Sequence, residues 1–156
     1  MADHTAKDIA DFLFLLVPHT STDDADQLTW RKLKYILYCA QGGALVWINR
    51  PLFAEDFIRG ENENDPIMLP SIDGLYSKYR GAPLPFDYYD DYGLDKDEIK
   101  VLNWAYDMFG CYTPVALKTL VTNSFPVRRT NRGWIIPKRT MKSHFDHEYF
   151  KTEYVK

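Results

Sequence analysis

The chain has 156 residues, a formal net charge of −3 and two cysteines. We expect one domain over residues 1–156, because a chain of about 150 residues can bury roughly 70% of its unfolded surface without a structural metal or disulfide. Cys39 and Cys111 lack CxxC spacing and lie in apolar stretches, which indicates buried thiols in a reducing compartment. Asp8 and Asp11 interrupt the first apolar stretch, residues 9–17, and so argue against a signal peptide or a membrane span. The prediction is a cytoplasmic protein that does not enter a membrane.

The first predicted helix begins after Thr5 and ends before Pro18. Thr5, with Asp8 three residues later, forms a variant of the capping box that marks a helix N-terminus. One apolar face at helical spacing contains Ile9, Phe12, Leu13, Leu16 and Val17.

Residues 28–57 are the most informative part of the chain, and they begin with a long apolar helix. One stripe at helical spacing contains Trp30, Leu33, Leu37, Ala40, Ala44 and Ile48, and a second contains Ile36, Cys39, Gly43 and Trp47. A helix this apolar around its circumference must be enclosed by other elements, so we place it at the centre of the domain. Periodicity alone also allows a helix that stops at Gly42, followed by a short buried strand over residues 44–48. We favour the continuous helix.

Charged residues and glycines stand out in this central helix. Arg31, Lys32 and Lys34 predict a solvent-exposed N-terminal end. Gly42 and Gly43 lie inside the helix, where each disfavours the helical state by about 1 kcal/mol relative to alanine. Close approach of a second helix is the expected reason for both glycines.

The middle of the chain is predicted to be irregular and then helical again. Residues 51–69 lack a helical period and contain Pro, Gly and Asn, so we expect short strands at residues 52–58 and 67–69. A short helix over residues 71–79 should place Ile72, Leu75, Tyr76 and Tyr79 inward. Residues 81–93 are interpreted as a loop.

Two further helices have clear N-terminal signals. Asp95 with Glu98 is another capping box, and the helix that follows should end at Gly110 in the left-handed conformation. Thr113 before Pro114 begins the next helix, whose buried stripe is Leu117, Leu120 and Val121. We expect these helices to pair antiparallel. Residues 134–136 should be extended, and a last helix from about residue 137 carries Met141 and Phe145. The predicted fold is mainly α, a compact single-domain helical array around the central buried helix with a small irregular or β-containing insertion.

Catalytic signatures are scarce. His144 and His147 are three residues apart, as two metal ligands on one helix face would be, but the sequence offers no third ligand, no HExxH and no CxxC. A GxSxG nucleophile motif and a glycine-rich phosphate loop are also missing from the sequence. We therefore expect no catalytic residues, no cofactor and no metal, and a protein that is not an enzyme.

Two segments have the composition of a binding surface. Residues 88–92 interleave tyrosines with acids, a makeup that suits recognition of a basic partner, although tyrosines in loops also commonly fold back on the core. Residues 127–142 contain six Lys and Arg and no acid, which suits either phosphates or an acidic protein. The hypothesis for the partner-binding residues is Tyr88, Tyr89, Asp90, Asp91, Tyr92, Arg128, Arg129, Arg132 and Trp134.

Several motifs together resemble a known family. They are Thr-Ala-x-Asp-Ile-Ala at residues 5–10, Lys-Leu-Lys-x-x-x-Tyr-x-Ala-Gln-Gly at residues 32–42, Arg-Pro-Leu-Phe-x-Glu-Asp-Phe at residues 50–57, Pro-x-x-x-Gly-Leu-Tyr at residues 70–76, and the acidic-capped helix at Asp95. Their order and spacing resemble the Panacea domain of SocA-like, phage-associated antitoxins of bacterial toxin–antitoxin pairs. The chain departs from the family pattern at residues 64–68 and 123–127, and we expect partner specificity in residues 51–93 and 127–142.

The resemblance implies an antitoxin that neutralises a cognate protein toxin by direct binding, without a cofactor. It equally allows an adaptor that hands the toxin to a protease or chaperone. A different interpretation is a phage or mobile-element transcriptional regulator that binds nucleic acid through the basic C-terminal region. The acidic net charge and the lack of a helix-turn-helix pattern count against that alternative. The sequence leaves the oligomeric state open.

Overall fold

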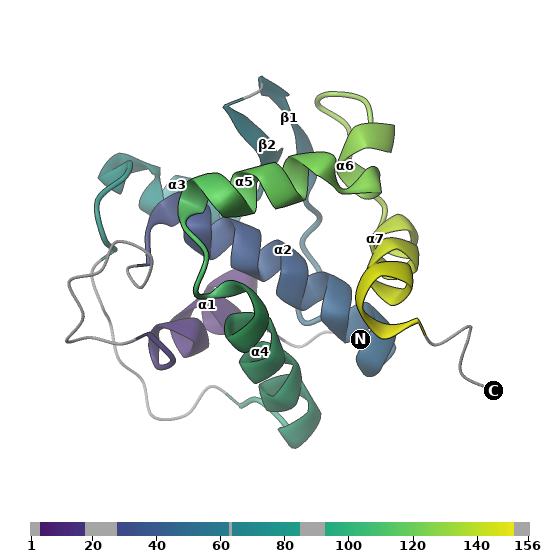
Figure 1. Ribbon diagram of the computed structural model, residues 1–156. Coiled ribbons are helices and arrows are strands. Elements are labelled where there is room, and N and C mark those ends of the chain that lie inside the picture. Colours follow the sequence, from purple (N-terminus) through teal and green to yellow (C-terminus); the bar gives the residue numbers. More distant parts are fainter. Residues whose placement is uncertain (1–3, 18–27, 63, 85–92, 152–156) are drawn as a thin grey trace.

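The computed structural model describes residues 4–17, 28–62, 64–84 and 93–151 (Figure 1). The fold is mainly α-helical with one small antiparallel sheet, as the sequence predicts. In chain order the elements are α1 (Ala6–Phe14), α2 (Trp30–Trp47), β1 (Ile58–Asn62), β2 (Asp65–Met68), α3 (Pro70–Tyr76), a 3₁₀ turn (Ser77–Tyr79), α4 (Lys96–Phe109), α5 (Pro114–Asn123), α6 (Phe125–Arg129), α7 (Lys138–Phe145) and a π-helical turn (Asp146–Phe150).

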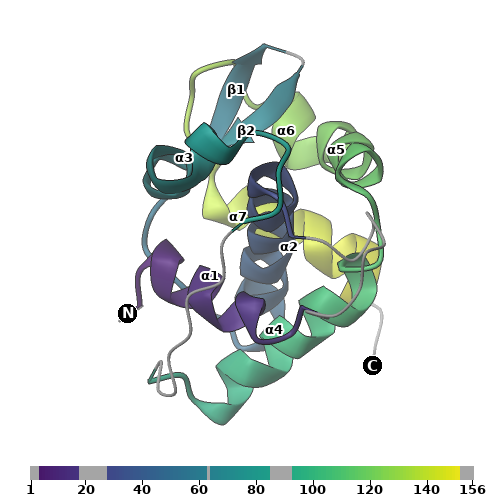
Figure 2. The same cartoon turned by 90° about the vertical axis from the view of Figure 1, so that its left-hand side faces the viewer.

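Helix α2 lies at the centre of the molecule. The two views show α1, α4, α5 and α7 around it, with the β1–β2 hairpin at one end (Figures 1 and 2). All residues from 32 to 45 are buried, and the helix runs through Gly42 and Gly43 without a break. The prediction of a continuous, enclosed helix is therefore confirmed, and no strand forms at residues 44–48.

Both glycines of α2 are sites of close approach, as predicted. A Cβ atom on Gly42 would lie 2.1 Å from the Phe145 ring of α7, and one on Gly43 would lie 2.4 Å from the Trp104 ring of α4. The neighbours that require bare backbone are thus aromatic side chains from two different helices. Two ring positions therefore set how closely α4 and α7 approach α2.

The prediction that Lys32 and Lys34 lie in solvent is wrong. Both residues are fully buried. The Lys32 ammonium donates a hydrogen bond of 2.5 Å to the carbonyl oxygen of Gly110, the residue that ends α4. The last carbonyls of a helix have no partner within the helix and carry partial negative charge, so a cation there is stabilising. Gly110 has φ −66 rather than the predicted left-handed conformation, and Lys32 satisfies its carbonyl instead.

Two more polar side chains of α2 bind other parts of the chain. The Gln41 amide donates to the carbonyl of Phe53 at 2.8 Å and accepts from the Leu52 N–H at 2.7 Å. The Tyr38 hydroxyl lies 3.0 Å from the Ser124 hydroxyl, at the junction of α5 and α6. Because a buried polar group without a partner is costly, each of these contacts specifies which segment packs beside α2.

The first strand lies further along the chain than predicted, whereas the second begins two residues earlier than expected and overlaps the predicted strand. Strands were expected at residues 52–58 and 67–69, whereas β1 and β2 pair antiparallel with Ile58 opposite Met68. The apolar residues before β1, including Leu52 and Phe53, instead fill the core from a turn held by Gln41. Residues 134–136 are extended, as predicted, and Ile135 pairs with Ile58 on the other side of β1 from β2.

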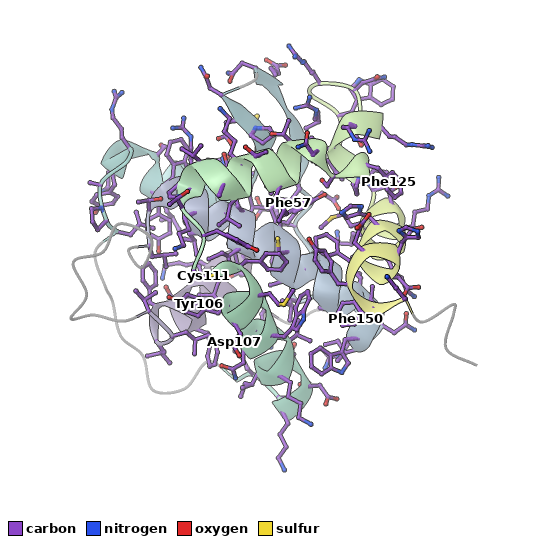
Figure 3. All side chains as sticks on the ribbon, viewed as in Figure 1. Phe57, Tyr106, Asp107, Cys111, Phe125 and Phe150 are labelled. Atoms are coloured by element: carbon purple, nitrogen blue, oxygen red, sulfur yellow. The ribbon has the colours of Figure 1, made fainter. Side chains whose placement is uncertain are left out.

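The caps at Thr5, Asp95 and Thr113 are confirmed, with the side-chain bonds in place. Helix α1 ends at Phe14, earlier than the expected end before Pro18. Leu75, predicted to face inward, is 40% exposed, and Cys111, predicted to be a buried thiol, is exposed at the turn after α4 (Figure 3).

Helices α4 and α5 do not form the predicted antiparallel pair. They run in clearly different directions, and each packs on α2 (Figure 1). The buried residues of α5, Leu117 and Val121, belong to the same core as Val101 and Leu102 of α4. A large central helix offers each of them a separate apolar face, so direct pairing is not needed.

The glycines allow a test of this packing. Gly42→Ala is expected to lower the free energy of unfolding by about 1–2 kcal/mol, because the clash with the buried Phe145 ring outweighs the gain in helix propensity. Gly74→Ala, in α3 with open space around its Cβ position, should raise it by about 0.5–1 kcal/mol. Urea denaturation of both variants measures the difference, and a Gly42→Ala protein as stable as the wild type would contradict the close approach.

Candidate partner-binding surface

A groove surrounds the tip of the β1–β2 hairpin. It consists of three adjoining hollows of about 520, 320 and 520 Å³, all lined in part by Asn64 at the hairpin turn. The first lies between the hairpin and α5, the second between α5 and the start of α2, and the third between the hairpin, α2 and α3. We call these hollows together the hairpin groove.

One end of the hairpin groove is basic. Arg59 of β1, Lys118 of α5 and Arg132 line the first hollow, and no described Asp or Glu lines it. The Arg132 guanidinium donates to the carbonyl of Glu61 at 3.2 Å, and that of Arg59 donates to the carbonyl of Pro66 at 3.3 Å. We call this end the basic pocket.

The opposite end is acidic and contains a buried ion cluster. The Lys34 ammonium binds the carboxylates of Asp65 and Asp73, the latter at 3.0 Å. Asp73 also accepts from the Trp30 indole N–H at 2.7 Å and from the Leu69 N–H at 2.9 Å. These contacts hold the start of α2 against β2 and α3, so the cluster fixes the position of the hairpin.

The same cluster affects Tyr35. Burial, together with the nearby Asp65 carboxylate, raises the pKa of the Tyr35 phenol well above its ordinary value. Its hydroxyl lies 3.3 Å from Asp65 and lines the middle of the hairpin groove. The phenol therefore remains a neutral hydrogen-bond donor at physiological pH.

A rigid apolar edge lies next to the basic pocket. We call residues 133–136 the edge segment, because their backbone pairs with β1: the Arg59 N–H donates to the Trp134 carbonyl at 2.9 Å, and the Ile136 N–H donates to the Phe57 carbonyl at 2.8 Å. Trp134 is 66% exposed and Ile135 is 55% exposed. Two large apolar side chains are thus presented to solvent from an ordered strand.

The other predicted basic residues line a separate hollow of about 380 Å³. Arg128 and Arg129 lie there with His144 and His147, near the α5–α6 junction marked by Phe125 (Figure 3). The Arg128 side chain donates to the Asn123 carbonyl at 2.9 Å, and the Arg129 guanidinium lies 5.3 Å from the Phe125 ring centroid. Asn123 lines both this hollow and the basic pocket, so the two basic regions adjoin at the end of α5.

The structure brings together only part of the predicted binding set. Arg132 lines the basic pocket, Trp134 lies in the edge segment with its backbone paired to Arg59, and Arg128 and Arg129 lie in the adjoining hollow. The five residues predicted in the acidic tyrosine segment, Tyr88, Tyr89, Asp90, Asp91 and Tyr92, lie outside the described residues.

Sequence analysis missed Arg59 and Lys118. Arg59 lies in a segment expected to be irregular, and Lys118 lies on the polar side of a helix whose neighbours are distant in sequence. The departure from the resembled family at residues 64–68 and at Asn123 was a usable signal, because Asn64, Pro66 and Asn123 all line the basic pocket.

Among the described residues, no group of three or more His, Cys, Asp or Glu is arranged to hold a metal ion. In the described part of the chain, no helix combines the length and the apolar character that crossing a bilayer requires. Comparison of the chain with models of protein families, with curated proteins and with solved structures found no match.

The Lys34 cluster can be tested by charge removal. Lys34→Met keeps the side-chain length but leaves the Asp73 carboxylate without its cation and Asp65 with only the more distant Arg31, at 3.9 Å, so the free energy of unfolding should fall by about 3 kcal/mol. Lys100→Met, at an exposed position of α4, should change it by less than about 0.5 kcal/mol. Equal effects in chemical denaturation would show that Lys34 does not hold the hairpin.

His144 should make stability depend on pH. Burial lowers the pKa of His144 below its ordinary value of 6.5, so the unfolded chain takes up the proton first as pH falls. The free energy of unfolding should therefore decrease as pH falls from about 6.5 towards the folded-state pKa, and His144→Gln should weaken that decrease. Denaturation of the wild type and of His144→Gln at pH 7 and 5.5 measures the difference, and equal slopes in the two proteins would contradict the prediction.

Proposed function

We propose that the protein is an antitoxin of the Panacea type, which neutralises a cognate protein toxin by binding it directly, without catalysis or a cofactor. The observation that carries the proposal is the edge segment: a tryptophan with 66% of its surface exposed, on backbone paired to β1, beside Arg132. Trp and Arg are the residues that most often dominate the energy of protein interfaces. An apolar centre with charged residues around it is the usual makeup of such a surface.

The ordered backbone of the edge segment also favours binding. A side chain on a mobile loop loses conformational entropy when it is buried by a partner. The Arg59 N–H already holds the Trp134 carbonyl, and the Ile136 N–H holds the same segment to Phe57, so less ordering remains for the complex to supply. This argument supports recognition of a folded partner.

The charge around the edge segment indicates the character of the partner. Arg59, Lys118 and Arg132 lie on one side of Asn123, and Arg128 and Arg129 lie on the other. Arg59, paired to Trp134 through the backbone, and Arg132, two residues before it, favour a partner with an acidic surface and speed its association at low salt. The proposed toxin surface is therefore acidic around an apolar pocket.

The resemblance supports the same proposal in a different way. The motif residues Lys32, Lys34, Tyr38, Gln41 and Gly42 are all buried and hold the fold together. The proposed binding residues that the structure describes, among them Arg59, Arg132 and Trp134, lie elsewhere, in the segments where we expect partner specificity. A shared scaffold with a variable surface is what a family of antitoxins with different partners requires.

Five adjoining cations also favour a second candidate, a regulator that binds nucleic acid through phosphate contacts. The two candidates predict different roles for Trp134. A toxin interface depends on the tryptophan itself, whereas phosphate binding depends on the cations and on salt concentration.

Co-expression with the protein encoded by the neighbouring gene tests the proposal. The wild-type chain should restore growth and co-purify with the neighbour's product. Trp134→Ala should weaken the complex at least about 30-fold, about 2 kcal/mol, because a buried tryptophan anchor is lost. Trp47→Ala is the matched control, since Trp47 is also exposed, at 47%, but lies at the far end of α2 from the hairpin.

Melting temperatures of both variants show whether the folded state is retained. If the neighbour is not toxic, or if the two proteins neither rescue growth nor co-purify, the antitoxin proposal fails. If the wild-type and Trp134→Ala chains bind duplex DNA equally well, and if this binding is lost at high salt, the regulator is supported instead. Toxin levels that fall on co-expression only when a protease is present would indicate the adaptor form.

A further inference from the structure

The separate hollow of about 380 Å³ contains a buried histidine. We call it the α6–α7 hollow, because its lining comes mainly from these helices and the π-helical turn: Arg128 and Arg129 of α6, Ser143 and His144 of α7, and His147 and Glu148 of the turn. His144 is only 8% exposed. Its ring packs edge-on against the rings of Phe125 and Phe145 and makes no hydrogen bond with any described residue.

The ring nitrogens of His144 remain within reach of a ligand. Among the described side chains, the nitrogen and oxygen atoms that are both fully enclosed and unpaired belong to Asp11, Arg31 and Thr122, and none belongs to His144. The nitrogens of His144 therefore keep contact with the hollow that this residue lines. A buried polar group without a partner is costly, so a ligand that pairs with the ring is favoured.

Arg128 and Arg129 bring two positive charges to the same hollow. The Arg128 Nε donates to the Asn123 carbonyl at 2.9 Å, and its other N–H groups bind no described residue. The Arg129 guanidinium lies 5.3 Å from the Phe125 ring centroid and has no hydrogen bond or ion pair with the described part of the chain. Each guanidinium thus retains donors in the fork geometry that matches a carboxylate.

The carboxylate of Glu148 limits which ligand the charge of the hollow favours. It lies 3.7 Å from the His147 ring and forms no ion pair with either arginine. Two guanidinium groups and one carboxylate leave an excess of one positive charge, which a single carboxylate balances. A phosphate monoester carries about −1.5 to −2 at neutral pH and would be repelled more strongly by Glu148. A metal cation would instead meet two guanidinium charges.

We propose that the α6–α7 hollow binds a carboxylate group, which accepts hydrogen bonds from Arg128, Arg129 and a ring N–H of His144. A neutral imidazole has one N–H donor, so the ring can make this bond without being protonated. The π-helical turn at Asp146–Phe150 supports the assignment, because single π-helical turns are rare and often occur at functional sites. A small free acid and the acidic side chain of a peptide present the same group.

NMR titration of the ¹⁵N-labelled full chain in about 0.05 M NaCl tests the site, with the ring signals of His144 as the readout. Propionate should shift these signals with a Kd of about 5 mM or tighter, whereas uncharged propionamide should not shift them. The capped tripeptide acetyl-Gly-Glu-Gly-amide is the third probe. Tighter binding of the tripeptide than of propionate would identify a peptide side chain as the source, and weaker binding would identify a free acid. Methyl phosphate is the fourth probe.

Two variants and one control make the result specific. Arg129→Gln should weaken propionate binding at least about fivefold, because it removes one of the two guanidinium groups. Arg139→Gln removes the same charge from an exposed position of α7 outside the hollow, and should weaken binding less than about 1.5-fold. Glu148→Gln should tighten binding about two- to threefold, because it removes the anion that repels the ligand.

The affinity should also depend on pH through His144. Burial lowers the pKa of His144, Glu148 acts against that shift, and His147 and Arg128 add to it. A carboxylate bound beside the ring stabilises the protonated form and raises this pKa. By linkage, propionate should bind about threefold more tightly at about pH 6 than at about pH 7.5. His144→Gln, followed through the backbone amide signal of Arg129, should remove this dependence.

The proposal is overturned if neither carboxylate probe shifts the His144 signals at about 20 mM, or if methyl phosphate binds as tightly as propionate. Equal effects of Arg139→Gln and Arg129→Gln would also overturn it, and both arginines are exposed, so this comparison does not depend on a buried substitution. A pH dependence that persists in His144→Gln overturns the role of the ring. The titrations contain no toxin, so their failure leaves the antitoxin proposal standing, and failure of growth rescue leaves the carboxylate site standing.

Discussion

The whole fold depends on the complete enclosure of α2, a helix that nevertheless carries polar side chains. Within residues 32–45 every side chain is buried, so each ammonium, hydroxyl and amide needs a partner that the surrounding elements must supply. Lys32 forms a hydrogen bond with the end of α4, and Lys34 forms ion pairs with β2 and α3. Tyr38 forms a hydrogen bond at the α5–α6 junction, and Gln41 forms one with the turn before β1. Apolar burial supplies the drive for collapse, while these contacts determine which segment lies against which part of the helix. The glycine pair then sets the depth of the two aromatic rings, Phe145 and Trp104.

This arrangement separates two groups of residues with different tasks. The residues of the motif at 32–42, which contributes to the resemblance, lie inside the molecule and connect its elements. The proposed binding surface lies around the hairpin, where Arg59, Arg132 and Trp134 come from segments far apart in sequence. The link between the groups is the Lys34 cluster, because the same carboxylates that neutralise the buried ammonium also line the acidic end of the groove. A substitution of the buried Lys34 would therefore directly affect Asp65 and Asp73, which line the groove at the surface.

Sequence reasoning succeeded where the signal is local and failed where it depends on distant partners. The caps at Thr5, Asp95 and Thr113 were predictable because capping joins residues only three apart. The central helix was predictable because its apolar period is long. Lys32 was misjudged, since its acceptor, the Gly110 carbonyl, is 78 residues away and nothing near either residue reveals the pair. Gly110 was misjudged for the same reason, because a lysine satisfies the helix end that a left-handed glycine usually completes. For the binding surface, composition located the basic residues after α6, but Arg59 and Lys118 join them only through the tertiary fold.

The pairing of the edge segment with β1 affects which residues of this protein can be substituted during evolution. Backbone hydrogen bonds hold Trp134 and Ile135 in place, and these bonds do not depend on which side chains the two residues carry. Both side chains point largely into solvent, so their replacement disturbs little of the core. If the edge segment binds a partner as proposed, substitutions at the rim of the hairpin could change that partner while α2 and its buried contacts stay the same. Such a design lets recognition diverge quickly on a framework that is itself under tight physical constraint.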